Sequence, residues 1–235
     1  MRYFADYGRD GAYIWRFDLG EAGAGISGDL GSHWSYIATW LFGEVTAVTA
    51  VFGRVVPRAP RPDGAPFEAA EDSAMILLEF ANGATGNIHV SSVAYEPSPF
   101  GQLHQWELHG SEGTVHVTCD WDRIERVEGA RDVATPGGEW VRGGSGAGLE
   151  VLPIPDRLYE GLRRGSVHET YKDTFRERDN MARGFITAIA RGTAAVPSFR
   201  DAWRVQRIVD AAGRSAREGR RITIDEIAAG EEGDG

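Results

Sequence analysis

The sequence predicts an α+β fold, in which one open, mostly antiparallel sheet carries helices packed on one of its faces. The middle of the chain is rich in Val, Ile, Thr and aromatic residues, which favour pleated strands. Asn82-Gly83 and Glu112-Gly113 separate neighbouring strands there, and such short turns join only antiparallel strands. Helical patterns lie before and after this stretch, which is the segregated order of an α+β domain.

The first helix is expected over residues 29–42. Its apolar residues recur at spacings of four, three and four, which is one face of a helix: Leu30, Trp34, Ile37 and Leu41. Gly43 follows the last of them, where a left-handed C-cap residue belongs. Residues 1–25, which are Gly-rich and aromatic, form an entry segment without a clear period.

Six strands are expected in the central stretch. They are Val45–Val56, Ala74–Phe80, Thr85–Val93, Gln102–His109, Thr114–Cys119 and Arg123–Val127. The Pro- and Gly-rich segment between Arg58 and Pro66 is expected to be a surface loop, and residues 128–156, with their many glycines, a loop excursion.

Two helices are expected to close the chain. The apolar stripe of the first is Ala182, Phe185, Ile186 and Ile189, and Gly192 ends it. The second begins at a capping box, Ser198 with Asp201, and its buried face is Ala202, Val205, Ile208, Val209 and Ala212. A short strand, Arg221–Ile224, precedes an acidic tail, residues 226–235, that we expect to be disordered. Residues 1–235 are therefore expected to form a single domain.

Charge and composition exclude several classes of partner. The formal net charge is -10, which argues against nucleic acid, and no apolar run is long enough to cross a membrane. Cys119 has no second cysteine to pair with, and no secretory leader follows Met1. The expectation is a cytoplasmic protein. Four histidines fall on expected strands, and their spacings match no recognised zinc motif, so no metal site is expected; they are His89, His104, His109 and His116.

Asp29 and His33 are the residues most suited to chemistry. Their spacing of four puts both side chains on one helix face, which continues through Tyr36 and Trp40. A carboxylate beside an imidazole can hold one tautomer of the ring, and the ring can exchange a proton with a substrate hydroxyl. The alternative is purely structural, with Asp29 as the N-cap and His33 as an ordinary helix residue.

Several motifs carry a resemblance, and they follow one another along most of the chain. They are Trp15-Arg16, the run from Gly23 to His33 that contains Asp29-Leu30-Gly31-Ser32-His33, Trp40-Leu41-Phe42-Gly43-Glu44, Glu71-Asp72, Phe80-Ala81-Asn82-Gly83-Ala84, Gly110-Ser111-Glu112-Gly113-Thr114 and Pro197-Ser198. In this order they resemble the C-terminal domain of the Gfo/Idh/MocA family, named after glucose–fructose oxidoreductase and inositol dehydrogenase.

The resemblance implies the substrate-binding half of an oxidoreductase that uses NAD or NADP and acts on a sugar, polyol or related hydroxyl compound. His33 matches the family's catalytic histidine, and Asp29 matches its partner aspartate. Trp15 and Arg16 match positions beside the substrate. Tyr36 stands where many members carry an aspartate, so a neutral phenol replaces a carboxylate in substrate binding.

The family's cofactor-binding half has no counterpart in this sequence. No Gly-rich turn between a strand and a helix is found, and Lys172, the only lysine, is in the wrong context for the family's catalytic lysine. No cofactor-binding residues are therefore expected, and the chain is expected to be inactive alone. A truncated gene, a late start or a separate Rossmann-domain chain would each explain this.

Two further expectations concern partners and role. The resemblance implies a homo-oligomer formed through the sheet. The alternative to the enzyme is a non-catalytic module for carbohydrate binding or dimerisation, which would keep its binding without His33.

Overall fold

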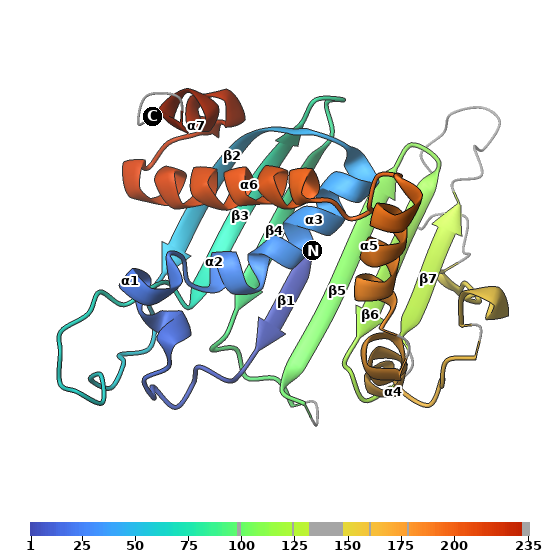
Figure 1. The fold of residues 1–235 in the computed structure, drawn as a ribbon, viewed down its shortest axis with the longest axis horizontal. Coiled ribbons are helices and arrows are strands. Elements are labelled where there is room, and N and C mark those ends of the chain that lie inside the picture. Colours follow the sequence, from blue (N-terminus) through green and yellow to red (C-terminus); the bar gives the residue numbers. More distant parts are fainter. Residues whose placement is uncertain (98–99, 124, 132–147, 160, 178, 232–235) are drawn as a thin grey trace. The chain divides into compact units, whose positions relative to one another are not determined.

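The computed structural model describes residues 1–97, 100–123, 125–131, 148–159, 161–177 and 179–231. They form two compact units, which are considered separately (Figure 1). The first unit is Met1–Pro97 with Gly184–Gly235, and the second is Ser98–Arg183. Residues 132–147 of the expected loop excursion and 232–235 of the expected tail lie outside the described residues. No helix in the described part of the chain has the length and apolar character needed to span a membrane.

The sheet of the first unit has the strand order β1-β4-β3-β2-β9. Its strands are β1 (Arg2–Ala5), β2 (Val45–Gly53), β3 (Ser73–Phe80), β4 (Thr85–Ser91) and β9 (Ile222–Thr223). The Asn82-Gly83 turn joins β3 to β4 as expected, with Gly83 at φ +86°. All pairs are antiparallel except β1 with β4, which is parallel. The expected mostly antiparallel α+β class is thereby confirmed.

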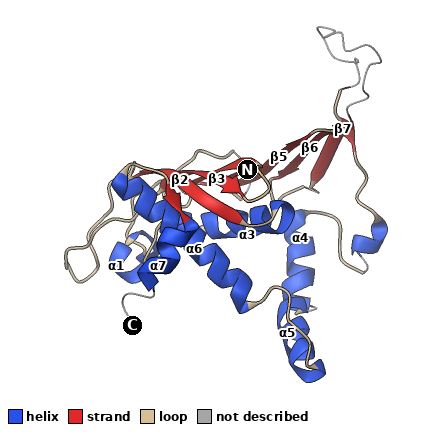
Figure 2. Cartoon of the chain, turned by 90° about the horizontal axis from the view of Figure 1, so that it is seen from above, coloured by secondary structure: helices blue, strands red, loops and turns tan. Residues whose placement is uncertain are grey.

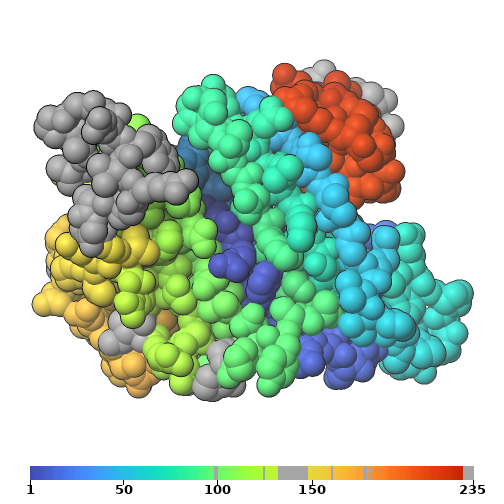
Figure 3. Space-filling view, turned by 180° about the vertical axis from the view of Figure 1, so that it is seen from behind, coloured from blue at the N-terminus to red at the C-terminus, as the bar shows by residue number. Residues whose placement is uncertain are grey.

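Helices cover one face of this sheet (Figure 2). Against it lie α2 (Ile26–Asp29), α3 (Gly31–Phe42), α6 (Phe199–Glu218) and α7 (Ile224–Glu231), while α1 (Leu19–Ala22) precedes them. Alternation along β3 explains the burial, because Ile76 and Leu78 are buried whereas Met75 and Leu77 are exposed on the other face. Figure 3 shows that second face, where side chains of β2, β3 and β4 form the surface.

Helix α6 is tied to β2 by a buried serine. The capping box of Ser198 and Asp201 is present, as expected, and the buried face includes Val205, Ile208 and Val209; Ala202, however, is exposed. The hydroxyl of Ser215, which is fully buried, accepts a hydrogen bond from the Ala50 amide at 2.9 Å and donates to the Arg220 carbonyl. The helix is thus fixed to the sheet by a polar contact as well as by apolar packing.

The second unit contains an antiparallel sheet in the order β5-β6-β7-β8. Its elements are β5 (Gln102–Gly110), β6 (Gly113–Cys119), β7 (Arg126–Arg131), β8 (Glu150–Val151) and α4 (Val167–Lys172). The strand expected at Arg123–Val127 begins later, because the Asp120 carboxylate accepts the amide of Arg123 and holds a turn. The prediction of a loop over residues 128–156 is wrong for residues 128–131 and 150–151, which belong to β7 and β8.

One expectation about the last third of the chain is confirmed and another is wrong. Helix α5 (Asn180–Arg191) ends at Gly192 (φ +62°) as expected, and its apolar stripe is exposed; the stripe comprises Ala182, Phe185, Ile186 and Ile189. Residues 226–231 are helical rather than disordered. The acidic side chain of Glu226 explains this, because it accepts the Thr223 amide at 3.0 Å and stabilises the start of α7.

Candidate active site

The segment that leads to Asp29 is fixed by a buried glutamate. Glu71 Oε1 accepts the backbone amides of Gly25 and Ser27, both at 3.0 Å, and the Glu71 carbonyl accepts the amide of Ile26 at 2.9 Å. A Cβ on Gly25 would lie 2.2 Å from that carbonyl oxygen, so only glycine fits. This clamp positions the single turn of α2, whose last residue is Asp29.

Asp72, the neighbour of Glu71, supports the same region from another side. Its carboxylate accepts the amides of Val55 and Val56 and forms an ion pair with Arg58 at 2.9 Å, with both charged side chains buried. The Arg58 guanidinium lies 3.7 Å from the ring centre of Phe17, which anchors the 3-10 turn Trp15–Phe17. Arg16 is therefore presented from a turn held by buried groups.

The structure brings Asp29, Arg16 and Trp15 together with a residue that the sequence did not single out, Tyr7. The Tyr7 hydroxyl donates to Asp29 Oδ2 at 2.6 Å, and Arg16 Nε lies 3.4 Å from the same oxygen. The Arg16 guanidinium stacks 4.8 Å from the Trp15 ring centre. We call Tyr7, Trp15, Arg16 and Asp29 the carboxylate cluster. Its side chains are part-exposed, so a hydroxyl compound could contact donors and acceptors there.

Tyr7 is held in its protonated form. Burial raises the pKa of the phenol most, and the hydrogen bond to Asp29 and the negative charge of that carboxylate raise it further. The phenol therefore acts as a donor to Asp29 and not as a base.

His33 lies in the first turn of α3, beyond the break at Leu30 that separates it from α2. The helix thus begins two residues later than expected, and Asp29 caps nothing in α3, because the N-cap residue is Leu30. The imidazole is exposed, and no hydrogen bond to it is found among the described residues; Asp29 instead contacts Tyr7 and Arg16. A group that reaches outward in this way can exchange protons with a ligand.

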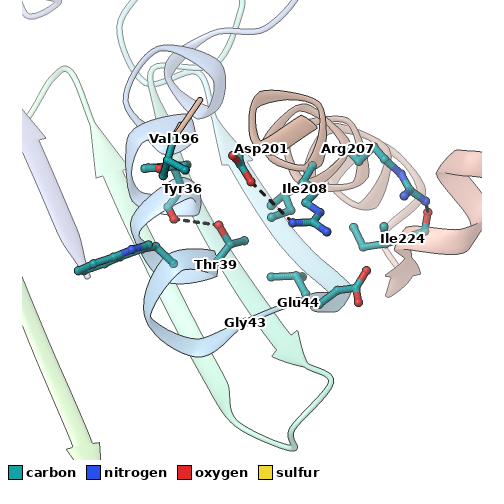
Figure 4. A pocket seen from close by; sticks show the side chains of 12 residues that line it. Tyr36, Thr39, Gly43, Glu44, Val196, Asp201, Arg207, Ile208 and Ile224 are labelled. Carbon is teal, nitrogen blue, oxygen red and sulfur yellow. Dashed lines mark hydrogen bonds and ion pairs between the residues drawn. The ribbon is translucent and has the colours of Figure 1, made fainter. Parts of the chain in front are cut away.

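Tyr36 does not join the carboxylate cluster. It lies one turn after His33 and lines a cavity of about 400 Å³ between α3 and the start of α6, together with Trp40 and Val196 (Figure 4). Its carbonyl accepts the Thr39 hydroxyl at 2.8 Å. Of the five residues singled out in the sequence, the structure therefore brings three together, Trp15, Arg16 and Asp29. His33 follows Asp29 by four residues along the chain, and Tyr36 lines the separate cavity between α3 and α6.

Tyr7 was missed because its hydrogen bond to Asp29 spans 22 residues and depends on how the entry segment folds. Nothing in residues 1–25 distinguishes it from Tyr3 or Tyr13. For Glu71 the signal was present, since Glu71-Asp72 was one of the motifs that carried the resemblance, but its role as a clamp for Gly25 became visible only in the structure.

The glycine segment before α2 is not a phosphate-binding turn. Such a turn offers free backbone amides before the helix of a βαβ unit, but the amides of Gly25 and Ser27 are bonded to Glu71. Nor do three acidic, cysteine or histidine side chains of the described residues converge as a metal site would require.

Comparisons with known proteins agree with this fold. Residues 1–116 match the GFO/IDH/MocA C-terminal domain. The chain is 28% identical, over 97% of its length, to levoglucosan dehydrogenase of Pseudarthrobacter phenanthrenivorans. It is 27% identical, over 86% of its length, to D-apiose dehydrogenase of Paraburkholderia graminis. Over residues 1–116 the chain therefore matches the C-terminal domain of the Gfo/Idh/MocA family, and the two relatives extend the similarity over most of the chain.

Solved structures show the same similarity. Levoglucosan dehydrogenase in complex with NADH and levoglucosan matches with a TM-score of 0.71 and 26% identity, over 94% of this chain and 57% of that one. The complex with NADH and L-sorbose matches with a TM-score of 0.72 and 25% identity. This chain spans 59% of the Pseudarthrobacter protein and 45% of the Paraburkholderia protein.

Proposed function

We propose that this chain is the substrate-binding half of an NAD- or NADP-dependent oxidoreductase that acts on a sugar, polyol or related hydroxyl compound. One observation carries the proposal: Asp29 is held by Tyr7 and Arg16 on the helical segment that leads directly into the exposed His33. The similarity to dehydrogenases named for levoglucosan and D-apiose supports the sugar as substrate class.

The residues divide the work as follows. Oxidation of an alcohol removes the hydroxyl proton and a hydride, and the exposed His33 imidazole takes the proton. Asp29, oriented by Tyr7 and Arg16, accepts a substrate hydroxyl and fixes its direction. Arg16 donates to a second hydroxyl, and the Trp15 indole offers an apolar face to the sugar ring. Tyr36 contacts the substrate only if the substrate extends from His33 along α3.

We propose that the nicotinamide is held by another domain or a separate Rossmann-domain chain, because the amides of Gly25 and Ser27 before α2 are already bonded to Glu71. The chain alone is expected to give no turnover with NAD or NADP and any sugar.

A sugar-binding titration tests the proposal. Calorimetry with levoglucosan, D-apiose and L-sorbose is expected to show binding of at least one of them, weakened roughly 10-fold or more by Asp29→Ala or Arg16→Ala, because each truncation removes a charged hydrogen-bond partner. The matched control is Asp63→Ala, a carboxylate in the exposed loop that bonds only its own turn. Equal binding by the wild type, the cluster variants and the control would contradict the proposal.

His33 separates the enzyme from a non-catalytic module. In the complex with a nucleotide-binding partner, His33→Asn is expected to lower kcat by about 10²- to 10⁴-fold, because a positioned proton acceptor contributes that much. Sugar affinity should change little. His109→Asn, which alters an exposed histidine on β5, should leave both unchanged. Full turnover without the His33 imidazole would show that His33 is not the proton acceptor. Sugar binding without turnover in both the wild type and His33→Asn would leave the alternative, a non-catalytic carbohydrate-binding or dimerisation module.

We also propose that the chain forms a homo-oligomer through the open face of the sheet. Val51, Met75 and Leu77 are each more than half exposed there, and they follow one another across β2 and β3. An exposed apolar sheet face of this kind is typical of a protein–protein contact.

A further inference from the structure

A buried guanidinium without a counter-ion borders the cavity between α3 and α6. Only 9% of Arg207 is exposed, and arginine is rarely buried to this extent unless it is paired. One of its terminal nitrogens donates to the Ile224 carbonyl at 2.6 Å (Figure 4), and the guanidinium lies 4.6 Å from the ring centre of Trp203. No carboxylate of the described residues forms an ion pair with it, and its Nε has no hydrogen-bond partner among them.

The surroundings of Arg207 compensate its charge only in part. Burying a charge is unfavourable unless an opposite charge or a full set of hydrogen bonds replaces the lost water. A carbonyl oxygen and an indole face are both neutral, and a neutral amide side chain could serve the Ile224 carbonyl equally well. A charged group at this place is better explained by an anion that enters the adjoining cavity.

The cavity has the size and lining of a small-molecule site. Its volume of about 400 Å³ lies toward the lower end of the range of ligand pockets, about 300–1,000 Å³. Helix α3 contributes Trp40, which is 73% exposed, so its indole face is open to a ligand. It also contributes Thr39, whose hydroxyl donates to the Tyr36 carbonyl and can still accept a hydrogen bond from a ligand hydroxyl.

The other charged residues of the cavity indicate how much charge the ligand carries. Asp201 accepts the amide and the hydroxyl of Ser198, at 2.8 and 2.7 Å, and lies 3.7 Å from Arg204. Glu44 is exposed, so water screens its charge. One positive charge, that of Arg207, remains to be neutralised. A phosphate group carries about -1.5 to -2 charges and would repel the two carboxylates, so a single carboxylate fits better.

We propose that the cavity between α3 and α6 binds a small hydroxylated monocarboxylate of the sugar-acid class. The carboxylate of the ligand pairs with Arg207 and with Arg204, which borders the cavity from the same helix. The carbon skeleton of the ligand lies against the Trp40 indole. Its hydroxyl groups donate to Thr39 and Glu44.

This site is separate from the carboxylate cluster. None of the residues that line the cavity belongs to that cluster. Asp29 is a carboxylate there, and one of its oxygens is already bonded to Tyr7, so the cluster suits a neutral hydroxyl compound rather than an acid. A neutral sugar and a sugar acid can therefore bind the chain at the same time, and the inference stands independently of the proposed function.

Calorimetry on the full chain tests the inference, with D-gluconate and D-glucuronate as probes. The wild type is expected to bind at least one of them. Arg207→Met keeps the apolar stem and removes the charge, and it is expected to weaken binding about 30-fold or more, as the loss of a buried charge pair does. Trp40→Ala and Arg204→Gln should weaken it several-fold, because both side chains line the cavity.

The variants also allow folding to be separated from binding. Replacing an unpaired buried charge by an apolar side chain is often neutral or stabilising, so Arg207→Met is expected to fold. Trp40 is an exposed residue, so its truncation leaves the core intact. Circular dichroism checks both variants. The matched control is Arg200→Gln, an exposed arginine of α6 that does not line the cavity and should leave the affinity unchanged.

Three results would overturn the inference. The first is that the wild type binds neither acid, and the second is that Arg207→Met binds them as tightly as the wild type. The third is loss of binding in Asp29→Ala, which would place the acids in the carboxylate cluster. Arg207-dependent binding of inorganic phosphate that is tighter than that of either acid would overturn the assignment to a monocarboxylate. Unchanged binding in Asp29→Ala together with loss in Arg207→Met supports the proposed site.

Discussion

At the scale of single residues, the carboxylate cluster depends on groups whose importance lies in their contacts rather than in their own chemistry. Tyr7 fixes one oxygen of Asp29, and Glu71 fixes the turn that carries it. Neither touches His33, yet both determine where the carboxylate points.

Tyr7 makes stability depend on alkaline pH. Its folded-state pKa is raised above the ordinary 10.0, so its contribution is fully present below pH 10.0 and is lost as the pH rises beyond it, where the unfolded chain ionises first. In Tyr7→Phe the alkaline loss of stability is expected to be smaller, and the stability at neutral pH lower by about 1 kcal/mol for the part-exposed hydrogen bond. Urea unfolding at several pH values measures both effects.

Tyr95→Phe is the control for this comparison. Tyr95 is 71% exposed, and its ring interacts with Arg9 without a hydrogen bond to a carboxylate. If the loss of stability at alkaline pH changed equally in both variants, the raised pKa of Tyr7 would not be the cause of that loss.

Gly25 is the position at which a single methyl group should disturb the site. Its Cβ would meet backbone atoms of Glu71 at 2.2 and 2.8 Å, and backbone cannot move aside as a flexible side chain would. Gly25→Ala is expected to cost about 1–3 kcal/mol or more of unfolding free energy and to weaken sugar binding as well. Gly20→Ala, where the nearest atom is a side-chain oxygen at 3.4 Å, should cost far less. Chemical denaturation measures the unfolding free energy of the two variants, and calorimetry measures their sugar binding.

At the scale of elements, the sequence predicted where most strands lie along the chain but few of the pairings between strands. The strand-favouring composition of Ala74–Phe80 and the Asn82-Gly83 turn were sufficient for β3 and β4, because those signals are local. The pairing of β1 with β4 joins residues far apart in the chain, so no local pattern could indicate it. The exposure of the α5 stripe could not be predicted for a related reason: periodicity shows which side of a helix is apolar, not what covers it.

The same limit applies to the site. The spacing of Asp29 and His33 predicted one helix face for both side chains, but the break at Leu30 places the two residues on two helices, and the spacing rule assumes one. The resemblance placed Arg16 beside the substrate but did not predict its contact with Asp29, since the two are joined by the fold of the Gly-rich segment.

Ser215 offers a test of how α6 is attached to β2. Removing its hydroxyl leaves the buried Ala50 amide without its acceptor, so Ser215→Ala is expected to cost about 1–3 kcal/mol. Ser35→Ala is a suitable comparison, because that hydroxyl is also buried but has no hydrogen-bond partner within the described residues. Thermal unfolding followed by circular dichroism gives the difference; similar losses in both variants would show that the Ala50 contact contributes nothing.

At the scale of the whole molecule, the first unit exposes apolar side chains on the open face of its sheet, among them Val51, Met75 and Leu77. None of these residues belongs to the carboxylate cluster, so the proposed contact through this face leaves the candidate site free.

The open sheet face should control self-association. Leu77→Glu introduces a charge among Val51, Met75 and Leu77 and is expected to shift the chain toward monomer, because a buried unpaired charge opposes association. Sedimentation velocity over a range of concentrations measures this shift. Thr193→Glu, an exposed residue after α5 and outside the sheet, is the control; an unchanged distribution in Leu77→Glu would exclude this face as the contact.

Glu71 and Asp72 have a consequence for anyone who wishes to redesign this protein. One carboxylate holds the turn that presents Asp29, and the next holds the Val55–Val56 backbone at the start of the long loop. In extended chain, successive side chains point in opposite directions, so inserting or deleting one residue before β3 would exchange the two. The ligand-binding turn and the loop therefore cannot be grafted independently. A designer who shortens or replaces the loop must keep the number of residues before Glu71 unchanged. Otherwise the shorter side chain of Asp72 would face the Gly25 amide in place of Glu71.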